Sequence, residues 1–435
     1  MKKLISIILL SFVGYSLATN YTWVGTNNAL WGVSSNWNPV GVPNSSNDIA
    51  VFKTRLRNVK LNQTVTLGGI IVSNTTGLSH SQSIIAQGTQ TIYLVRSPRV
   101  DLRIVYFTSG DTITFNGTGT VGNRLNVIQS NDVVFSVDSY TGSGGMRLSE
   151  ANTYWYTGDN SLYASNSSGL PTSFFYAFSG SGFFPKMSGN FIVKNAQANF
   201  ESGTSLTGLS SIVMYDAEIN ESAGDLDVYS DFILMGNTNT IKRTTYTQRL
   251  NLAGVISGTG GVVFNSTRST QQAVADSYWI SGTNTYSGPT YIVGGLTGGV
   301  LGYSVYRLRA FNAFGSSTIL RVDDKSMLRI EANNVISDAA SVYLDTGTSV
   351  VSTILINFTS PGMNETINKL YVDDIQQQNG TWGATGSGSQ WTNDTVFVNS
   401  NGIITVTDGP GVPPVKGVLS GNKFIVIGSK LFGKE

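Results

Sequence analysis

The 435-residue chain contains no cysteine and only one histidine. Without cysteine it forms no disulfide and no thiolate metal site. A single histidine excludes sites built from several imidazoles and nearly excludes a histidine-dependent catalytic triad. That residue, His80, lies in a serine-rich segment and is expected to be an ordinary exposed loop residue. No catalytic, cofactor-binding or metal-binding residue is therefore predicted from these two residue types.

Charge is also scarce, since Asp, Glu, Lys and Arg make up 12% of the chain and the formal net charge is +1. Long surface helices need charged faces, so few are expected. A nearly neutral chain lacks the basic footprint of a nucleic-acid-binding protein, and no nucleic-acid partner is predicted. Arg96, Arg99 and Arg103 form a local basic patch, which is interpreted as a solvated strand face.

Long apolar runs are missing beyond the first residues. Residues 1–18 combine a basic start at Lys2 and Lys3, an apolar core over 4–13 and a small-residue cleavage site at 16–18, which predicts a signal peptide. No other stretch reaches the roughly 18 apolar residues of a membrane-spanning helix. The mature chain is expected to be secreted, extracellular or held at the cell surface, without a transmembrane helix.

Glycine is abundant, with 49 residues, and short runs alternate apolar and polar side chains. Such alternation is typical of half-buried strands. Apolar runs that begin near Ile192, Ile212, Ile233 and Leu252 recur about every 20 residues, which suits one coil of a β-solenoid. The predicted fold is all-β, a right-handed parallel β-helix or β-solenoid with a capping segment. A stacked pair of β-sandwiches is the alternative.

Three segments carry a family resemblance. The stretch 280–293 follows a glycine, asparagine and tyrosine pattern at Gly282, Asn284, Thr285, Tyr286, Gly288, Thr290 and Val293. A tryptophan-rich pattern near the start comprises Trp23, Trp31, Asn36, Trp37, Pro43, Asp48, Ala50 and Phe52. A closing pattern spans 367–374, 380–384 and 401–406, with Asp374 where glycine is usual. Together they resemble bacterial autotransporter-associated β-strand repeat proteins. The resemblance implies a passenger-like chain without the membrane barrel.

Four regions are expected. Residues 1–18 are the signal peptide, and residues 19–60 are a tryptophan-rich N-terminal cap. The end of a solenoid exposes an apolar cross-section, which large aromatic side chains can cover. A carbohydrate-binding aromatic platform is the competing interpretation of these tryptophans. Residues 61–407 are predicted to form the solenoid and 408–435 a Pro/Gly linker and C-terminal tail.

An irregular, aromatic-rich insertion is expected within the solenoid at about 138–190. Its aromatic groups lie at 154–156, 174–178 and 183–184. They are expected either to pack against the flank of the solenoid or to form an exposed binding patch.

Acidic groups that could serve polysaccharide cleavage are few, namely Asp323 with Asp324, Asp373 with Asp374, and Asp216 with Glu218. Adjacent residues on a strand point to opposite faces, so only the last pair would share a face. That pair could bind a cation or act as two catalytic carboxylates, and a solvated strand face is the competing interpretation.

The predicted function is an exported, non-catalytic surface or extracellular-matrix protein, an adhesin-like or structural β-helical rod without cofactor. Its expected partners are surface glycans or other cell-envelope proteins, and self-association is left open. The alternative is a polysaccharide-binding or polysaccharide-cleaving β-helix protein.

Overall fold

The computed structural model is almost entirely β-structure. The residues that it describes are 18–53, 57–73, 81–95, 99–105, 112–116, 125–129, 132–137, 145–149, 153–166, 173–177, 186–195, 197–200, 209–221, 226–243, 249–268, 274–296, 303–323, 325–347, 355–399, 401–410, 417–420 and 423–426. Within these ranges the one helical element is the short 3₁₀ turn η1 (Ser34–Asn36), and no helix there is long and apolar enough to cross a membrane. The predicted signal peptide, apart from Ala18, lies outside the described residues.

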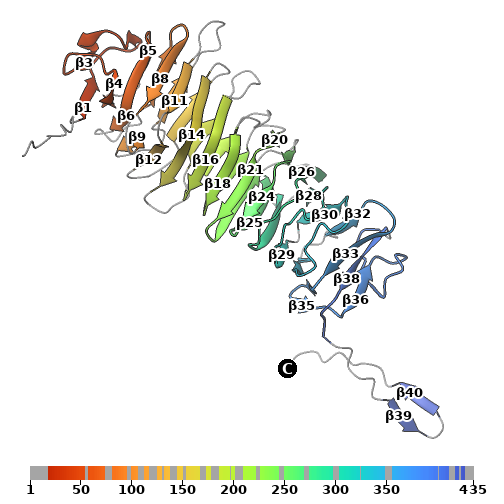
Figure 1. Ribbon diagram of the computed structural model, residues 1–435. Helices are drawn as coiled ribbons and strands as arrows, with labels where there is room; N and C mark the ends of the chain where they lie inside the picture. Colours follow the sequence, from red (N-terminus) through yellow and green to blue (C-terminus); the bar gives the residue numbers. More distant parts are fainter. Residues whose placement is uncertain are drawn as a thin grey trace, which may run out of the picture.

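Three sheets run along an elongated molecule (Figure 1). Sheet A has 13 strands: β1 (Thr19–Trp23), β3 (Trp37–Asn38), β4 (Ser45–Phe52), β6 (Val65–Ser73), β8 (Gln90–Leu94), β9 (Arg99–Val105), β11 (Leu125–Gln129), β12 (Asp132–Val137), β14 (Thr153–Asn166), β16 (Lys186–Lys194), β18 (Leu209–Tyr215), β21 (Asp231–Met235) and β24 (Ile256–Gly258). Sheet B has 15 strands: β2 (Ala29–Leu30), β5 (Arg57–Leu61), β7 (Ser81–Ala86), β10 (Thr112–Asn116), β13 (Gly145–Ser149), β15 (Ser173–Ala177), β17 (Gln197–Phe200), β19 (Glu218–Glu221), β22 (Thr238–Arg243), β25 (Gly261–Arg268), β27 (Thr290–Leu296), β29 (Ile319–Val322), β31 (Ser341–Leu344), β34 (Lys369–Val372) and β35 (Ile375–Gln376). Sheet C has six strands: β20 (Leu226–Val228), β23 (Leu250–Leu252), β26 (Val274–Ile280), β28 (Tyr303–Leu308), β30 (Ser326–Ile330) and β32 (Ile356–Phe358).

The chain winds through these sheets in turn. It passes from β20 in sheet C to β21 in sheet A and β22 in sheet B, and then repeats this order with β23, β24 and β25. Neighbouring strands pair in parallel, except for β1 with β3 and β34 with β35 at the ends of sheets A and B. Antiparallel pairing dominates β-sandwiches. The parallel winding therefore confirms the predicted all-β solenoid and excludes the sandwich alternative.

The length of one coil varies along the chain. Gln197 pairs with Glu218, 21 residues later, close to the predicted step. Farther on, Thr290 pairs with Leu320, a step of 30 residues. The step of about 20 residues predicted from Ile192 to Leu252 therefore does not extend to the later coils, and Leu252 belongs to sheet C rather than to the sheet A stack. The width of a face limits strand length, whereas the corner connections are free to vary.

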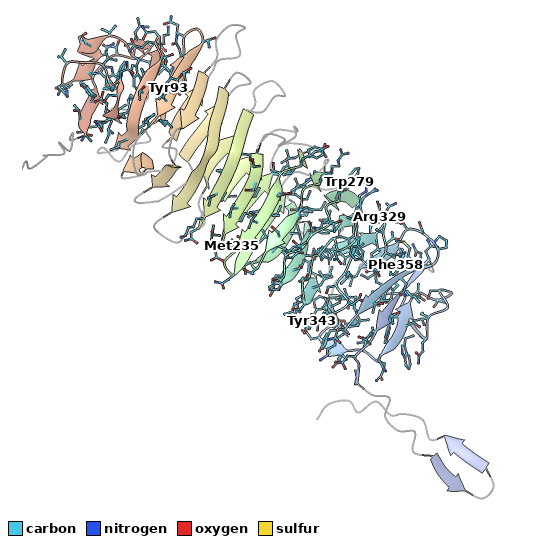
Figure 2. The ribbon with its side chains drawn as sticks, in the orientation of Figure 1. Tyr93, Met235, Trp279, Arg329, Tyr343 and Phe358 are labelled. Carbon is cyan, nitrogen blue, oxygen red and sulfur yellow. The ribbon has the colours of Figure 1, made fainter. Side chains whose placement is uncertain are left out.

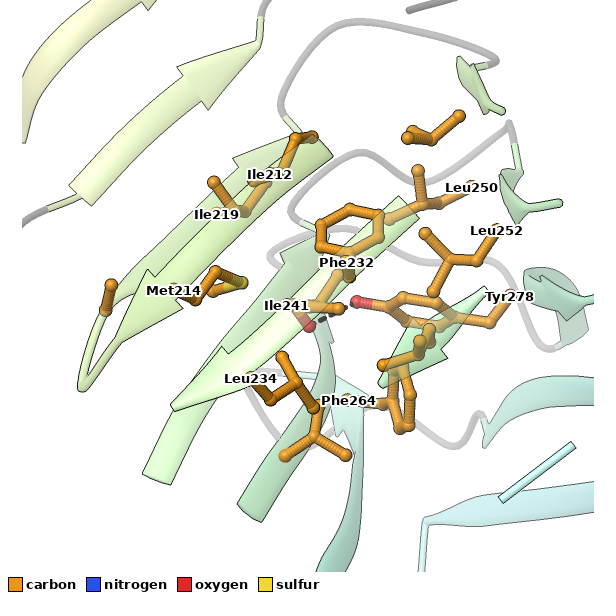
Figure 3. Packing of buried hydrophobic residues seen from close by; sticks show 14 of the residues in the cluster. Ile212, Met214, Ile219, Phe232, Leu234, Ile241, Leu250, Leu252, Phe264 and Tyr278 are labelled. Carbon is orange, nitrogen blue, oxygen red and sulfur yellow. Dashed lines mark hydrogen bonds between the residues drawn. The ribbon is translucent and has the colours of Figure 1, made fainter. Parts of the chain in front are cut away.

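The core lies inside the coil, where inward side chains of the three sheets meet (Figure 3). The buried side chains drawn and labelled there are Ile212, Met214, Ile219, Phe232, Leu234, Ile241, Leu250, Leu252, Phe264 and Tyr278. Tyr278 is the polar member of this set, and its hydroxyl lies 2.7 Å from the carbonyl oxygen of Ile241, to which it donates. Each large apolar side chain buried in this way stabilises the fold by about 1.5–3 kcal/mol.

The motif stretch 280–293 lies where backbones of successive coils approach closely. A Cβ atom on Gly282 would lie 2.1 Å from the carbonyl oxygen of Gly254 in the preceding coil, so only glycine fits. Asn284 and Tyr286 point inward and are buried. The Tyr286 hydroxyl shares a 2.7 Å hydrogen bond with Thr290, and burial raises its pKa far above the usual value. The motif is thus explained by stacking and internal hydrogen bonding.

Three tryptophans close the N-terminal end of the rod. The indoles of Trp23, Trp31 and Trp37 are buried, with ring centroids 4.8 Å apart for the first and third and 4.7 Å apart for the second and third. Phe52 packs on the same cluster. The Trp37 Nε1 group donates to the carbonyl oxygen of Trp31 at 2.8 Å. The alternative of a carbohydrate-binding platform is wrong for these residues, because buried rings offer no face to a sugar.

Replacing Trp37 with phenylalanine is expected to lower the free energy of unfolding by about 1–3 kcal/mol, because the carbonyl oxygen of Trp31 loses its donor and part of the ring volume is left empty. Urea denaturation followed by circular dichroism measures this loss. An unchanged denaturation midpoint would show that the cluster does not hold the end of the rod together.

The segment 138–190 differs from the expected insertion. Its described strands, β13, β14, β15 and the start of β16, pair in parallel with neighbours in sheets A and B. Its backbone therefore continues the solenoid. The side chains of its aromatic groups at 154–156 and 174–178, and all of 183–184, lie outside the described residues.

The C-terminal end carries two smaller sheets. Four strands form the first, β33 (Met363–Ile367), β36 (Gly380–Gly383), β37 (Trp391–Thr392) and β38 (Gly402–Val406), and two form the second, β39 (Gly417–Ser420) and β40 (Lys423–Val426). Trp382 and Trp391 stack in the four-stranded sheet with ring centroids 5.9 Å apart. The two-stranded sheet is an antiparallel hairpin within the predicted tail.

Candidate functional site

The proposed carboxylate pair of Asp216 and Glu218 does not lie on one strand face. Asp216 has a φ of 46° and occupies the turn between β18 and β19. Its carboxylate accepts the backbone N–H groups of Asn237 at 2.6 Å and Thr238 at 3.0 Å in the next coil. The prediction of a shared face is therefore wrong, because an aspartate in a left-handed turn ends the alternation that the prediction assumed.

Glu218 lies on sheet B and is held by its neighbours. Its Oε1 atom accepts a hydrogen bond from Gln197 Nε2 at 2.6 Å and lies 3.9 Å from Lys242 Nζ. Burial raises the pKa of Glu218, and the charge of Lys242 opposes this shift. The side chain is thus one member of a polar ladder across successive coils.

The other acidic pairs also lie in turns or connections between strands. Asp373 and Asp374 both have positive φ, 50° and 60°, and form the two-residue turn that joins β34 to β35. Type I′ turns of antiparallel hairpins need a positive φ at both central residues. Aspartate tolerates this conformation, so Asp374 can occupy the position where the resembled family pattern has glycine. Asp323 accepts the backbone N–H of Gly294 and the hydroxyl of Ser326, whereas Asp324 lies outside the described residues.

Two further sequence candidates, His80 and the basic patch, lie beyond what the structure describes. His80 is outside the described residues. Of the basic patch, Arg96 is also outside them, as are the side chains of Arg99 and Arg103, whose backbone belongs to β9.

A group of charged residues not singled out by the sequence lies on the outer face of sheet C. We call it the arginine cluster, and its members are Arg249, Arg307, Arg309 and Arg329, with Trp279, Asp227 and Glu331. Trp279, Arg307 and Arg329 pair in register on β26, β28 and β30. Figure 2 shows Trp279 and Arg329 on one side of the rod and Tyr343 on the other.

Guanidinium groups surround the Trp279 ring. The Cζ atom of Arg249, just before β23, lies 4.1 Å from the ring centroid, and that of Arg309, just after β28, lies 4.4 Å from it. Arg307 is farther, at 5.5 Å. A guanidinium above an aromatic face is attracted by the ring quadrupole, by about 0.5–1 kcal/mol at exposed sites. The indole therefore holds arginines from the preceding and the following coil in place.

One carboxylate, that of Glu331, faces three of these arginines. Its oxygens lie 3.1 Å from Arg307 Nη1, 3.3 Å from Arg309 Nε and 3.1 Å from Arg329 Nε. The side chains of Arg309 and Arg329 are 41% and 37% exposed. Arg249 pairs separately with Asp227, at 3.4 Å. The part of the cluster around Glu331 thus presents guanidinium groups to solvent.

Sheet B shows a contrasting arrangement. Tyr343 and Tyr371 stack on its outer face with ring centroids 4.4 Å apart and an interplanar angle of 6°. Arg321 is bound by two carboxylates, Asp345 at 2.9 Å and Asp374 at 3.3 Å. The hydrogen bonds that Arg321 donates to the Asp345 carboxylate are the main cause of its raised pKa. Here the two tyrosine rings cover each other, and the single positive charge of Arg321 is paired with two negative charges.

A buried carboxyl lies at the C-terminal end. Glu365 in β33 is fully buried, and its Oε2 accepts the backbone N–H groups of Val335 at 2.9 Å and Ile336 at 3.1 Å. Burial raises its pKa to about 7, with a small contribution from Asp338, while the backbone N–H groups oppose the shift. Its contacts stack β33 on the preceding coil.

The raised pKa of Glu365 predicts a pH dependence of stability. The folded protein holds the proton up to about pH 7, and the unfolded chain releases it near the ordinary value of 4.5, so stability falls as pH rises between these values. The loss reaches roughly 3 kcal/mol above pH 7. Glu365→Gln removes this dependence. Urea titrations at pH 5 and pH 8 measure the difference in free energy of unfolding between the variant and wild type. This difference is expected to move in favour of the variant from pH 5 to pH 8, and an equal difference at the two pH values contradicts the prediction.

In the described part of the chain, no three His, Cys, Asp or Glu side chains gather closely enough to hold a metal ion. Comparison with family models, with curated proteins and with solved structures gives no match to this chain. The resemblance to autotransporter-associated repeats stays a prediction that rests on its three sequence segments.

Proposed function

We propose that the chain is an exported, non-catalytic protein of the cell surface or extracellular matrix that acts as an adhesin-like or structural β-helical rod. The observation that supports this most is the long stack of parallel strands between two ends packed with tryptophan. Adjacent strands lie about 4.8 Å apart, so the parallel part of sheet B alone spans about 60 Å. A rod of this kind can hold a binding face away from the surface that anchors it.

The polar contacts between coils suit a structural rod. Asp216 binds the next coil through backbone N–H groups, and Glu365 does the same to the preceding coil. Tyr343 and Tyr371 stack between adjacent strands of sheet B. These side chains stabilise the stacking of coils, which is the interaction on which the stability of a repeat array depends.

Export and the lack of catalysis are tested separately. The full chain and a version without residues 1–18 are expressed with a C-terminal tag, and cell fractions are compared. The full chain is expected outside the cytoplasm and shortened near residue 18, while the truncated one stays inside. An uncleaved full chain in the cytoplasm contradicts export.

The non-catalytic role is tested with the purified chain on a polysaccharide array. Product release from the array contradicts that role.

A further inference from the structure

The outer face of sheet C presents positive charge in a line along the rod. The cluster extends from Arg249 at β23 through β26 and β28 to Arg329 in β30. At the spacing of adjacent strands these three steps cover about 14 Å. The surface is therefore extended along the solenoid axis, and it matches a linear polymer that carries repeated negative charges better than a single small anion.

The chemistry of the cluster favours carboxylate. Glu331 shows that guanidinium groups from two neighbouring coils, those of Arg309 and Arg329, already converge on one carboxylate at 3.3 Å and 3.1 Å. Both side chains are more than one-third exposed, so donors remain at the surface for a further acceptor. Arginine presents its donors in a planar fork that matches carboxylate and phosphate geometry, and the anion that Arg309 and Arg329 face in this cluster is a carboxylate.

The environment of Trp279 distinguishes between two kinds of polyanion. Proteins that bind single-stranded nucleic acid stack its bases on open aromatic faces. Around Trp279 the guanidinium groups of Arg249 and Arg309 already lie 4.1 Å and 4.4 Å from the ring centroid. Stacking of a base or of a sugar ring on this indole would have to displace an arginine. The cluster therefore favours a ligand bound through its charged groups.

We propose that the arginine cluster of sheet C binds an acidic polysaccharide through its carboxylate groups, with Arg309 and Arg329 as the principal contacts. Glu331 holds the two arginines in the absence of the polysaccharide and competes with the ligand carboxylates. The inference deepens the proposed function by naming a partner. It rests on that function only for the location at which the protein encounters the polysaccharide. Binding by the purified chain is independent of export, so either claim can fail alone.

The test measures the affinity of the purified full chain for polygalacturonate, with dextran as a neutral polymer and single-stranded DNA as a different polyanion. Wild type is expected to bind polygalacturonate more tightly than DNA, to bind more weakly as salt rises, and to leave dextran unbound. Each guanidinium lost is expected to weaken binding about tenfold. Arg309→Gln with Arg329→Gln therefore lowers affinity about 100-fold, and Arg309→Gln alone about tenfold.

Two further variants make the test specific. Arg321→Gln on sheet B removes an equally exposed guanidinium, 39% exposed, and is expected to change affinity less than about twofold. Glu331→Gln removes the competing carboxylate and is expected to tighten binding. No binding of wild type at low salt overturns the proposal, as does an equal loss from Arg321→Gln or weaker binding by Glu331→Gln. DNA binding as tight as that of polygalacturonate overturns the choice of ligand.

Discussion

Replacing Asn284 with leucine is expected to lower the free energy of unfolding by about 2–6 kcal/mol, because two buried backbone groups lose their partners at about 1–3 kcal/mol each. The Asn284 side chain is buried in the core, where its Oδ1 accepts the N–H of Ile256 at 2.7 Å and its Nδ2 donates to the carbonyl of Ala313 at 2.6 Å. One amide thus joins the preceding and the following coil. Leucine has a similar shape but provides neither hydrogen bond.

The matched control is Asn251→Leu, on the outer face of sheet C. Its amide bonds Asp227 and Ser281 but is partly exposed, so water can replace those partners. This variant is expected to lose less than about 1 kcal/mol. Urea denaturation of both variants measures the difference. Equal losses would show that Asn284 is not the link between coils that the structure describes.

Arg243→Met is expected to lower the free energy of unfolding by about 3–5 kcal/mol, because it removes the positive charge that faces a buried carboxylate. Arg243 and Glu221 pair in register on β22 and β19, inside the solenoid. Their side chains are 1% and 0% exposed, and Arg243 Nε lies 3.4 Å from Glu221 Oε2. Low exposure is the reason for the large effect, since surface pairs contribute about 0–1 kcal/mol.

Two comparisons isolate the charge effect. The double variant Glu221→Leu with Arg243→Met removes both charges and is expected to be more stable than Arg243→Met alone, since an apolar pair of similar volume avoids a buried charge. Arg321→Met, at an exposed pair, is expected to cost less than about 1 kcal/mol. A double variant that is less stable than Arg243→Met would contradict the assignment of the loss to the Glu221 charge.

The sequence predicted what depends on local pattern. Alternation of apolar and polar residues predicted strands such as β18, whose alternate residues Ile212 and Met214 are buried. The glycine positions of 280–293 pointed to closely stacked turns, and Gly282 lies against the backbone of Gly254 as such a turn requires. These features are local because the face of a strand and the conformation of a turn are set by a few neighbouring residues.

The sequence did not predict features that depend on register between coils. Arg307 and Glu331 are 24 residues apart and meet only because β28 and β30 pair in a particular register. Coil lengths vary, so no fixed period could bring such residues together in advance. Asp216 was misplaced for a related reason, because the left-handed turn that it occupies interrupts the strand pattern on either side.

Continuous stacking of parallel strands is tested most directly by the distance between two spin labels on sheet B. Because the chain has no cysteine, Thr240→Cys and Tyr371→Cys provide the only two labelling sites. These positions are joined in register through Val263, Tyr291, Arg321 and Tyr343. Five steps between adjacent strands predict a Cα–Cα distance of about 24 Å, seen as a narrow distribution near that value once label length is considered. A distribution centred far from that distance, or one without a defined maximum, would contradict the stacked solenoid.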